Sequence, residues 1–464
     1  MIDRMGRILA AVLALVLAAA GAYIVAGYAA GPSLDIASPA KYVGLSTPLE
    51  VVVDAPGASL SSLHVDFAQG GTRTPLFAYD GGGSIASDPH VTLEGASRVH
   101  VKTIVGRETV KGLHSGAARV EVTAVRPVAF GLRRVQASAT RDLTVRLERP
   151  QVSVLSTKHY INQGGAEMVV YRVSPNDVAS GVSVGPYEYP GFPATGAAGE
   201  GVSISDPALR VAFFALRYDQ DVNAPIRVFA RDEAGNSATA DFDHRTFPKA
   251  FKKSRIQLDD AFLNRVVPAI LGGTTEVTAG PTTLASFLAI NGDLRTKNAE
   301  KIASFAAQTS PEMLWQGVTF HRFANTAVEA AFADRRTYVY QGKDVDQQTH
   351  LGFDLASVAN APVVAANRGK VLYADNLGIY GNCVIIDHGM GVQSLYAHLS
   401  SIAVKPGQAV EKEAVLGRTG ETGLAGGDHL HFTMLVDGVM VNPIEWWDPH
   451  WIEDRVLRKL RDVH

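Results

Sequence analysis

Short segments rich in β-branched residues recur through the first half of this chain, and glycine, proline or other turn-forming residues close each of them. Between residues 34 and 150 the expected strands are LEVVVDA, LHVDFAQ, RVHVKTIVG, ARVEVTAVRP and RDLTVRLERP. A second set follows between residues 151 and 248: QVSVLST, EMVVYRVSP, RVAFFALRYD and IRVFARDEAGNSATADFDH. Such segments favour strands over helices. The pattern therefore predicts a mainly β, multidomain protein that begins with two β-sandwich modules.

The last segment of the second set is expected to form two strands joined by a Glu-Ala-Gly-Asn turn. This arrangement resembles the closing hairpin of bacterial Ig-like domains. The resemblance implies Ig-like β domains at residues 34–150 and 151–248. Spacers that hold a distal domain away from a membrane are the favoured interpretation, and surfaces that bind protein partners are the alternative.

An uncharged apolar run occupies residues 8–30, and residues 1–7 before it carry two arginines. A helix needs about 20 such residues to cross a bilayer, so the run predicts a transmembrane signal anchor. The positive-inside rule then places residues 1–7 in the cytoplasm and the other domains in the periplasm or outside the cell. The expected localisation is the inner (plasma) membrane, with a single pass. A cleaved signal peptide is the alternative, because Gly27 and Ala29 form a small-residue cleavage site, but the length of the run favours a retained anchor.

Composition excludes some classes of function. The net charge is −3 and 46% of the residues are hydrophobic, so the chain has a globular composition and no electrostatic basis for binding nucleic acid. The single cysteine, Cys383, lies in the apolar run NCVIIDHG and rules out an intramolecular disulfide. A lone thiol in such a run is expected to be a small buried hydrophobic group rather than a nucleophile.

The periodicity becomes helical between residues 249 and 312. SRIQLDDAFLNRVVPAIL repeats apolar residues three and four apart, with Ser254 as the expected N-cap. Two more amphipathic segments, TTLASFLAI and TKNAEKIASFAAQ, are separated by Asn291-Gly292. These segments predict a helical connector. One hypothesis is that residues 255–309 restrain access to the following domain, and the alternative is that they complete its core.

The C-terminal residues 448–464 predict a final helix. Ile452, Val456 and Leu460 are spaced four residues apart, so they would form one apolar stripe. The helix is expected to dock on the last domain.

The strongest chemical signal is HLHFTMLVDGVMVNP, in which Asp-Gly separates two apolar runs and predicts a β-hairpin. Side chains alternate between the faces of a strand. The apolar residues of the first strand therefore face a core, whereas His429, His431 and Thr433 share the other face. Two imidazoles side by side suit one metal ligand and one acid/base group.

Two other segments carry histidine. In QSLYAHLS, the side chains of Ser394, Tyr396 and His398 are expected on one face of a strand, opposite an apolar face. In THLGFDLA, His350 and Asp354 have the spacing of a metal-ligand pair. A histidine and an aspartate four residues apart are weak evidence by themselves, but three histidine-bearing segments close together in the chain strengthen it.

Residues 322–447 are similar to the LytM/lysostaphin-type zinc metalloendopeptidases of peptidase family M23, which cut peptide cross-links in bacterial cell walls. The similarity runs through RRTYVY, THLGFDLA, APVVAANRGKVLYA, YGNCVIIDHGMGVQSLYAHLS, GQAVEKEAVLGRTGETG and GGDHLHF. Ala333 and Glu413 stand where the family usually has glycine, and both departures concern local loops outside the five site positions. Some relatives use an upstream asparagine as an inhibitory ligand, a role open to Asn325.

The resemblance implies an antiparallel-β zinc peptidase domain at residues 313–447, with a groove for an extended peptide. It implies Zn²⁺ as the cofactor and assigns its ligands to His350, Asp354 and His431. It also implies two non-ligand catalytic histidines, His398 and His429. Two histidines and one carboxylate leave a position open for water or substrate on tetrahedral zinc.

The implied function is that of a membrane-anchored zinc endopeptidase that hydrolyses peptide cross-links or stem peptides of peptidoglycan during cell-wall remodelling. The alternative is a catalytically silent LytM-like scaffold that binds and activates other cell-wall hydrolases. Such scaffolds lack ligands, whereas all five positions are filled here. A protease that acts on a secreted protein is a third hypothesis. The expected partners are a peptidoglycan peptide and the membrane.

Overall fold

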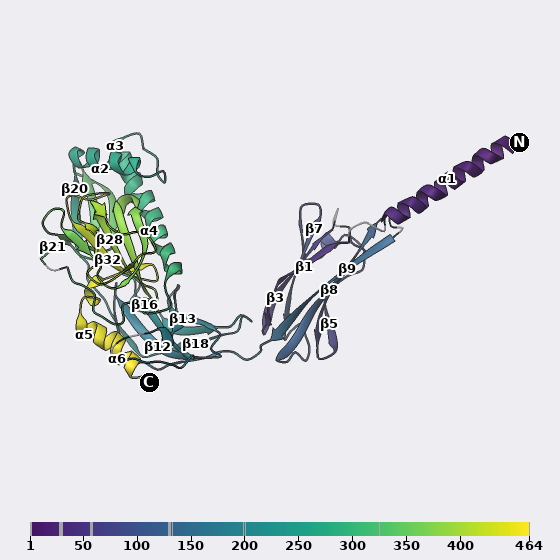
Figure 1. Ribbon diagram of the computed structural model, residues 1–464, viewed down its shortest axis with the longest axis horizontal. Coiled ribbons are helices and arrows are strands. Elements are labelled where there is room, and N and C mark those ends of the chain that lie inside the picture. Colours follow the sequence, from purple (N-terminus) through teal and green to yellow (C-terminus); the bar gives the residue numbers. More distant parts are fainter. Residues whose placement is uncertain are drawn as a thin grey trace. The chain divides into compact units, whose positions relative to one another are not determined.

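The computed structural model describes residues 2–26, 31–55, 59–128, 131, 133–197, 199, 201–323 and 325–463. The chain divides into two compact units, shown in Figure 1. Unit 1 comprises Met1–Pro150 with Arg231–Ser237, and unit 2 comprises Gln151–Ala230 with Ala238–His464. Each unit is described by itself below.

The N-terminal segment forms helix α1 (Ile2–Ala26). Its large apolar side chains are exposed, as at Leu9, Leu15 and Ile24. Within the described part of the chain, no helix combines the length and hydropathy that membrane crossing requires. The transmembrane segment predicted for residues 8–30 is therefore not supported by the structure, and residues 27–30 lie outside the described part.

The described strands of unit 1 form two sheets. The first has the order β1 (Ser33–Ser38), β3 (Ser46–Asp54), β7 (Arg98–Gly106), β6 (Val91–Glu94). The second has the order β2 (Tyr42–Val43), β9 (Arg133–Val145), β8 (Gly116–Val128), β4 (Ser62–Gln69), β5 (Thr72–Tyr79). Alternate residues of β3 and β4, including Val51, Val53, Leu63 and Val65, are buried in one shared core. The mainly β character is confirmed here, whereas the Ig-like type stays a prediction.

Unit 2 begins with another group of strands. One sheet has the order β10 (Gln151–Val154), β12 (Ala166–Ser174), β16 (Leu209–Ala215), β15 (Phe192–Pro193). A second has the order β14 (Tyr187–Pro190), β13 (Ala179–Val184), β17 (Ile226–Arg231), β18 (Ser237–Asp241), and β11 (His159–Asn162) pairs with β19 (His244–Phe247). This group shares one core with the C-terminal half: the ring of Phe213 lies 5.9 Å from that of Trp446, and the Asn162 side chain donates to Glu445 at 2.9 Å. The region around residues 151–248 is thus packed against the residues that follow it.

The C-terminal helical segment runs through α5 (Pro449–Ile452), the π-helical turn η8 (Glu453–Leu457) and α6 (Arg458–Arg461). Ile452, Val456 and Leu460 are all buried, as their spacing predicts. The helix contacts strand β12, and it also packs against residues of the predicted last domain: the ring of Trp451 lies 5.1 Å from that of Trp446, and the Leu457 side chain lies against Gly317. An ion pair joins the helix to β12, because Lys459 donates to the fully buried carboxylate of Glu167 at 2.7 Å. A buried carboxylate requires such a partner.

The predicted connector begins with a strand rather than a helix. Strand β20 (Lys253–Leu258) pairs in parallel with β22 (Asp334–Tyr340). Helix α2 (Asp260–Gly272) starts one turn later than predicted, and its N-cap is Asp259, which accepts from the Phe262 amide at 2.7 Å. Ser254 is therefore not an N-cap; its hydroxyl donates to the Asp334 carboxylate at 2.8 Å. Pairing with β22 supplies the backbone hydrogen bonds that overrode the helical periodicity.

The rest of the connector is one continuous helical run, made of α3 (Thr283–Ala289), the π-helical turn η4 (Ile290–Leu294), α4 (Arg295–Ser304) and the short 3-10 turn η5 (Phe305–Gln308). Asn291-Gly292 does not break it, because the Asn291 side chain is buried and donates to Asp346 at 2.7 Å. Phe287, Leu294 and Ile302 lie in the core of unit 2.

These contacts favour the hypothesis that the connector completes a core. A chain truncated through Ser310 loses β20 and the buried side chains of α2 to α4. We expect it to unfold at a lower temperature than the full chain and to show no gain in activity, because burial of each large apolar side chain contributes about 1.5–3 kcal/mol. Thermal unfolding and hydrolysis assays on both chains would check this. A stable, more active truncated protein would instead support restraint by residues 255–309.

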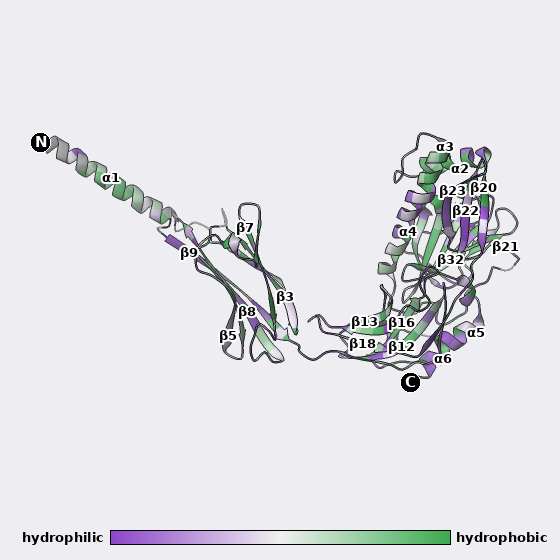
Figure 2. Ribbon diagram, turned by 180° about the vertical axis from the view of Figure 1, so that it is seen from behind, coloured by the Kyte–Doolittle hydropathy of each residue, from purple (hydrophilic) through white to green (hydrophobic). Residues whose placement is uncertain are grey.

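The C-terminal half is built on an eight-stranded sheet. Seven strands follow the order β21 (Ala327–Ala330), β24 (Phe353–Ala356), β32 (Leu430–Val436), β28 (Val392–Leu399), β27 (Asn382–Gly389), β26 (Gly369–Asn376), β30 (Ala409–Val410), and β33 (Val439–Val441) pairs with β32. The turn between β32 and β33 is Asp437-Gly438, with positive φ at both residues, so the predicted hairpin is confirmed. β25 (Pro362–Val364), β31 (Val415–Arg418) and β29 (Ser401–Ile402) form a small sheet, and β23 (Lys343–His350) pairs with β22. Figure 2 shows the hydrophobic interior of the large sheet and the more hydrophilic β22 and β23.

Candidate metal centre and active site

The side chains predicted to be metal ligands converge on one face of the large sheet. Asp354 on β24 is directly opposite His431 on β32, so both side chains leave the same face. His350, the last residue of β23, joins them. Nε2 of His350 lies 2.8 Å from Oδ1 of Asp354 and 2.9 Å from Nδ1 of His431, and that Nδ1 lies 3.0 Å from the same carboxylate oxygen. All three residues are buried.

This donor set fits a metal ion. Nε2 of His350, Oδ1 of Asp354 and Nδ1 of His431 form a nearly equilateral triangle. A hydrogen bond can place one proton between two of these atoms, but the third atom then has no partner. A cation at about 2.0–2.2 Å from each atom, the range for zinc bound to nitrogen and carboxylate ligands, would satisfy all three together. The geometry is thus that of a three-ligand site with room for a further ligand, and it does not distinguish zinc from other metals.

A second layer of contacts orients the ligands. Arg336 on β22 donates from Nη2 to the other carboxylate oxygen of Asp354 at 2.9 Å. Nδ1 of His350 lies 3.3 Å from the carbonyl oxygen of Ala331, and Ala333 donates its amide to the His350 carbonyl at 2.7 Å. Contacts of this kind hold the tautomer and ring direction of a ligand. The sequence analysis missed Arg336, although an arginine within the strand segment RRTYVY was a signal for a buried charge.

Ala333 and Glu413, at positions where the family usually has glycine, both adopt positive φ, 62° and 68°. The chain therefore keeps the left-handed conformation that explains the preference for glycine there.

Gly352 is required by the packing of His431. A Cβ atom on Gly352 would lie 2.5 Å from Nε2 of His431 and 2.9 Å from the backbone oxygen of Phe432. The imidazole therefore packs directly against the glycine backbone. This explains why a glycine separates His350 from Asp354.

A Gly352→Ala substitution is expected to displace the His431 ring and weaken metal binding by about 10- to 100-fold, the range typical of changes around metal ligands. Competition with a chromogenic chelator would measure the change. Gly427→Ala is a matched control, because a Cβ there meets nothing within 4 Å. Equal metal affinity in Gly352→Ala and the native chain would contradict the packing argument.

The two predicted catalytic histidines lie beside this site. The His398 ring is 4.8 Å from that of His429 and 5.8 Å from that of His431. Nδ1 of His398 lies 2.8 Å from the carbonyl oxygen of Thr422, and Nδ1 of His429 lies 2.8 Å from that of Gly427. A carbonyl can only accept, so each Nδ1 carries a proton and each neutral ring keeps a free lone pair on Nε2. Nε2 of His429 lies 3.4 Å from Oδ1 of Asp354.

His398 reaches the site by a route that strand alternation does not predict. Ala397 on β28 is opposite His431, so Ala397 and not Tyr396 shares the face of the site. Tyr396 lies on the other face, where its hydroxyl contacts Ser394 and the Ala366 amide. The prediction that His398 shares a face with Tyr396 is therefore wrong. His398 has φ of +63°, and this left-handed backbone turns its side chain toward His429.

Electrostatics distinguish the two histidines. Burial, together with His429 and His431, lowers the pKa of His398 well below its ordinary value. Burial also acts to lower the pKa of His429, but its contact with Asp354 outweighs this and leaves that pKa raised. Burial would raise the pKa of Asp354, whereas the surrounding His350, His429 and His431 hold it well below its ordinary value. At neutral pH, His398 is thus a neutral base beside an ionised Asp354.

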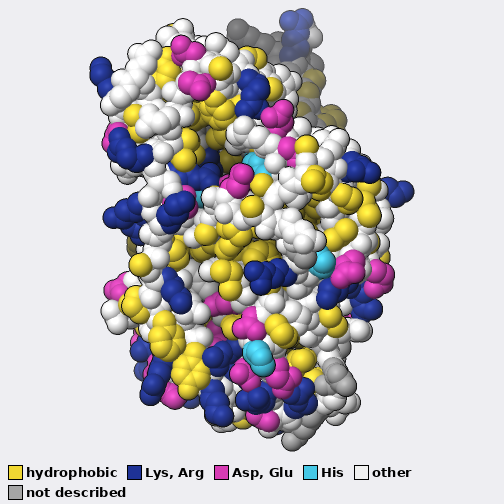
Figure 3. All heavy atoms as spheres, turned by 90° about the vertical axis from the view of Figure 1, so that its left-hand side faces the viewer, with side chains coloured by type: hydrophobic (Ala, Val, Ile, Leu, Met, Phe, Trp, Pro, Cys, Tyr) yellow, Lys and Arg dark blue, Asp and Glu magenta, His cyan; other side chains and the backbone are white. Residues whose placement is uncertain are grey.

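The site opens into a cavity of about 100 Å³. Its walls include Tyr338 from β22, Tyr380, and Arg295 from α4. Figure 3 shows a hollow on this side of the molecule in which basic and histidine side chains lie close together. Tyr338 lines the cavity, whereas Tyr340 donates its hydroxyl to Asp260.

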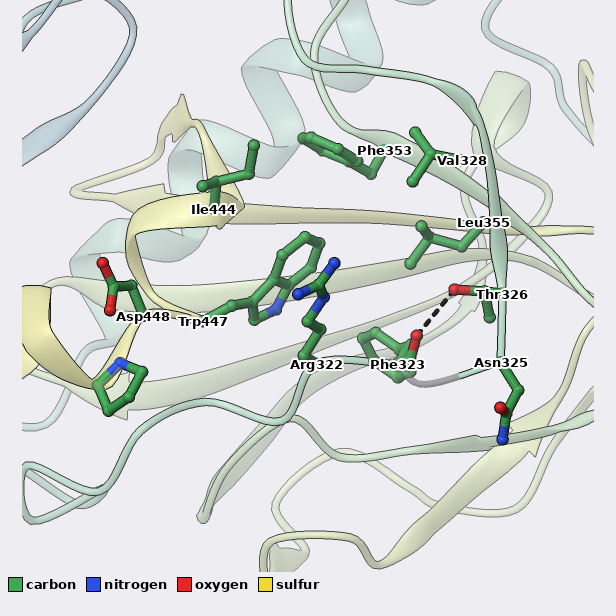
Figure 4. A pocket seen from close by; sticks show the side chains of 11 residues that line it. Arg322, Phe323, Asn325, Thr326, Val328, Phe353, Leu355, Ile444, Trp447 and Asp448 are labelled. Carbon is green, nitrogen blue, oxygen red and sulfur yellow. Dashed lines mark hydrogen bonds between the residues drawn. The ribbon is translucent and has the colours of Figure 1, made fainter.

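A larger pocket, of about 770 Å³, lies on the other face of the sheet (Figure 4). Phe353 and Leu355 line it, and they alternate with Asp354 along β24, so this pocket and the three converging donor atoms are on opposite faces. Asn325 also lines this pocket. The hypothesis that Asn325 is an inhibitory metal ligand is therefore wrong.

Comparison with known proteins identifies the domain that holds the site. Residues 348–443 match the model of peptidase family M23. The chain contains a peptidase family M23 domain. All three converging side chains lie within this M23 domain, as do His398 and His429. The family consists typically of metallopeptidases, in agreement with the donor set.

Relatives of the M23 domain are known from several bacteria. The DD-carboxypeptidase/endopeptidase Mpg of Neisseria meningitidis serogroup B is 40% identical over 95 residues, or 20% of this chain and 22% of that protein. The peptidoglycan DD-endopeptidase ShyA of Vibrio cholerae is 38% identical over 96 residues, or 21% of this chain and 22% of that protein. The chain thus matches about a fifth of the length of these curated relatives. A solved structure of a candidate M23 peptidase from Pseudomonas aeruginosa has 20% identity and a TM-score of 0.38, covering 61% of this chain and 94% of its own.

Proposed function

We propose that this chain is a zinc endopeptidase that hydrolyses peptide cross-links or stem peptides of peptidoglycan. The convergence of two imidazole nitrogens and one carboxylate oxygen within 3.0 Å of one another, with two more histidines beside them, carries this proposal. The names of the relatives Mpg and ShyA, a DD-carboxypeptidase/endopeptidase and a peptidoglycan DD-endopeptidase, support the substrate class.

The residues of the site suit peptide hydrolysis. When bound by His350, Asp354 and His431, zinc would polarise the scissile carbonyl and lower the pKa of a water ligand from 15.7 to about 7. His398 and His429 present Nε2 to the site, with Nδ1 held by backbone carbonyls. Each can accept the proton of the attacking water on Nε2, and a ring that is protonated there can donate a hydrogen bond to the developing oxyanion. Arg336 keeps the Asp354 carboxylate in place throughout.

We further propose that residues 8–30 anchor the chain in the inner membrane, with residues 1–7 in the cytoplasm and the M23 domain outside it. The uncharged run at residues 8–30 and the arginines before it support this. Cells that express the full chain are expected to retain it in the membrane fraction after a high-salt wash. The matched comparison is the same chain in which charged residues replace Leu13 and Leu17. Equal membrane retention of both would contradict anchoring by residues 8–30.

Purified protein and purified sacculi test the proposed hydrolysis. The chain is expected to carry close to one zinc ion and to release peptide fragments that mass spectrometry can assign to a cleaved bond. A chelator should stop the release, and added zinc should restore it. A zinc-loaded chain that releases nothing from sacculi would favour the alternative, a scaffold that activates other hydrolases. The presence of all five site residues argues against that alternative.

A further inference from the structure

The cavity beside the metal-binding residues receives one cation from outside the matched M23 region. Arg295 is the first residue of α4, in the connector, yet it lines the same cavity as His350, His398 and His429. The M23 match begins only at residue 348. This charge is therefore a feature of the present chain's own connector.

Arg295 is held in a defined position. Its Nε donates to the backbone oxygen of Asn291 at 3.1 Å, and its Nη2 donates to the side-chain oxygen of the same residue at 2.6 Å. Asn291 is completely buried and is fixed in turn by its hydrogen bond to Asp346. The guanidinium is thus preorganised, and less conformational entropy remains to be lost when it binds a further group.

Among the residues that the structure describes, the positive charge of Arg295 has no counter-ion. In the described part of the chain no carboxylate lies within ion-pair distance of Arg295, and both of its hydrogen bonds end on neutral amide oxygens. Arg336, in the same cavity, is instead paired with Asp354, and Arg265 on α2 is paired with Glu421. Arg295 is partly buried, so water satisfies its remaining donors only in part.

The guanidinium also lies near the metal-binding end of the cavity. It acts electrostatically on Tyr380, whose ring is 5.6 Å from the ring of His431. Tyr380 and Arg295 line the cavity together. A peptide held at the site would therefore pass close to this cation.

We propose that Arg295 binds a carboxylate of the peptide substrate, so that the site selects peptides with a free carboxylate next to the bond that is cut. The inference rests on the proposed peptidase function and names the substrate class more narrowly. Nη1 and the second hydrogen of Nη2 are available for a carboxylate, which is the anion that best matches a guanidinium. The carboxylate is either that of a side chain or that of a peptide C-terminus.

Pairs of synthetic peptides test this with the full-length chain. One pair differs only by a side-chain carboxylate or carboxamide beside the scissile bond, and the other by a free or amidated C-terminus. The native chain is expected to prefer the carboxylate member of one pair by about 10- to 100-fold in kcat/KM, mainly through KM, which is the range for a hydrogen bond to a charged group. The pair that shows the preference identifies the source of the carboxylate.

Variants of Arg295 show whether the preference depends on it. Arg295→Gln should bring the ratio for the preferred pair close to one, and Arg295→Lys should retain part of it. Arg255→Gln is the matched control, because Arg255 is an exposed arginine of the same connector that pairs with Asp344 and does not line the cavity. It should keep the native ratio. Zinc content and unfolding temperature are measured for all variants.

Calorimetric binding of the same peptides separates this inference from the proposed function. If the chain cleaves neither peptides nor sacculi yet binds the carboxylate member more tightly through Arg295, the hydrolase proposal fails and the inference holds. Equal binding of both members by the native chain overturns the inference whether or not cleavage occurs. A uniform loss of rate on both members in Arg295→Gln would reveal a purely structural role, and a uniform gain would reveal obstruction. Both results contradict the inference.

Discussion

Replacing His350, Asp354 or His431 by alanine is expected to remove bound zinc and hydrolytic activity together. Each substitution leaves two of the three converging donor atoms, and the tetrahedral site then has too few protein ligands to hold the ion. Changes around metal ligands already cost about 10- to 100-fold in affinity, so loss of a ligand should exceed that range. Elemental analysis of the purified variants, with digestion of sacculi, would measure both effects.

The control for this prediction is His321→Ala. His321 is a histidine of the same half of the chain, but it pairs with Glu413 away from the site. It should retain zinc and activity. Variants of His350, Asp354 or His431 that bind zinc as the native chain does would show that the ligand assignment is wrong.

Replacing His398 or His429 by alanine is expected to have the opposite pattern, with zinc retained and the rate reduced by about 10² or more. Neither side chain belongs to the triangle of donor atoms, and both present Nε2 to the site. A positioned acid/base group contributes on the order of 10²–10⁴ in rate. Zinc content and kcat, measured on the same preparations, would separate the two classes of residue.

His388→Gln is a comparison within the same set of buried histidines. His388 lies between the Arg368 carbonyl and the Ser394 hydroxyl, at 2.8 and 2.7 Å, and does not line the cavity. Its replacement should change stability more than kcat. Near-native turnover in both His398→Ala and His429→Ala would mean that another group moves the proton.

Local patterns were sufficient for several features. The Asp-Gly turn between β32 and β33 needs positive φ at two successive residues, a requirement that few dipeptides meet, so its hairpin was predictable. The alternation along β32 placed His431 opposite the core side chains, and the spacing of His350 and Asp354 suggested a ligand pair. The structure brings all five predicted site residues together, while their separate roles stay predictions until the variants are measured.

Other features failed because a distant segment overrode a local one. Residues 253–258 have helical periodicity, but pairing with β22 made them a strand and turned Ser254 from an N-cap into a partner of Asp334. The face of His398 was mispredicted because alternation assumes extended backbone, whereas this residue is left-handed. The contact of the C-terminal helix with β12, where Lys459 pairs with the buried Glu167, was not predicted, because no local pattern indicates it.

The sequence by itself determined the β character of the chain and the hairpin, because each depends on residue types within a few positions of one another, whereas the candidate donors His350, Asp354 and His431 came from the resemblance to a known family. Only the tertiary structure decided which cations join the site. Arg336 comes from β22 and holds the Asp354 carboxylate. Arg295 comes from α4 and lines the cavity with no counter-ion among the described residues. The position of Arg295 depends on how the connector packs against the sheet. One such contact is the hydrogen bond from Asn291 to Asp346, two residues that are 55 positions apart in the sequence. Such long-range contacts leave no periodicity in the sequence, so only the folded chain reveals them.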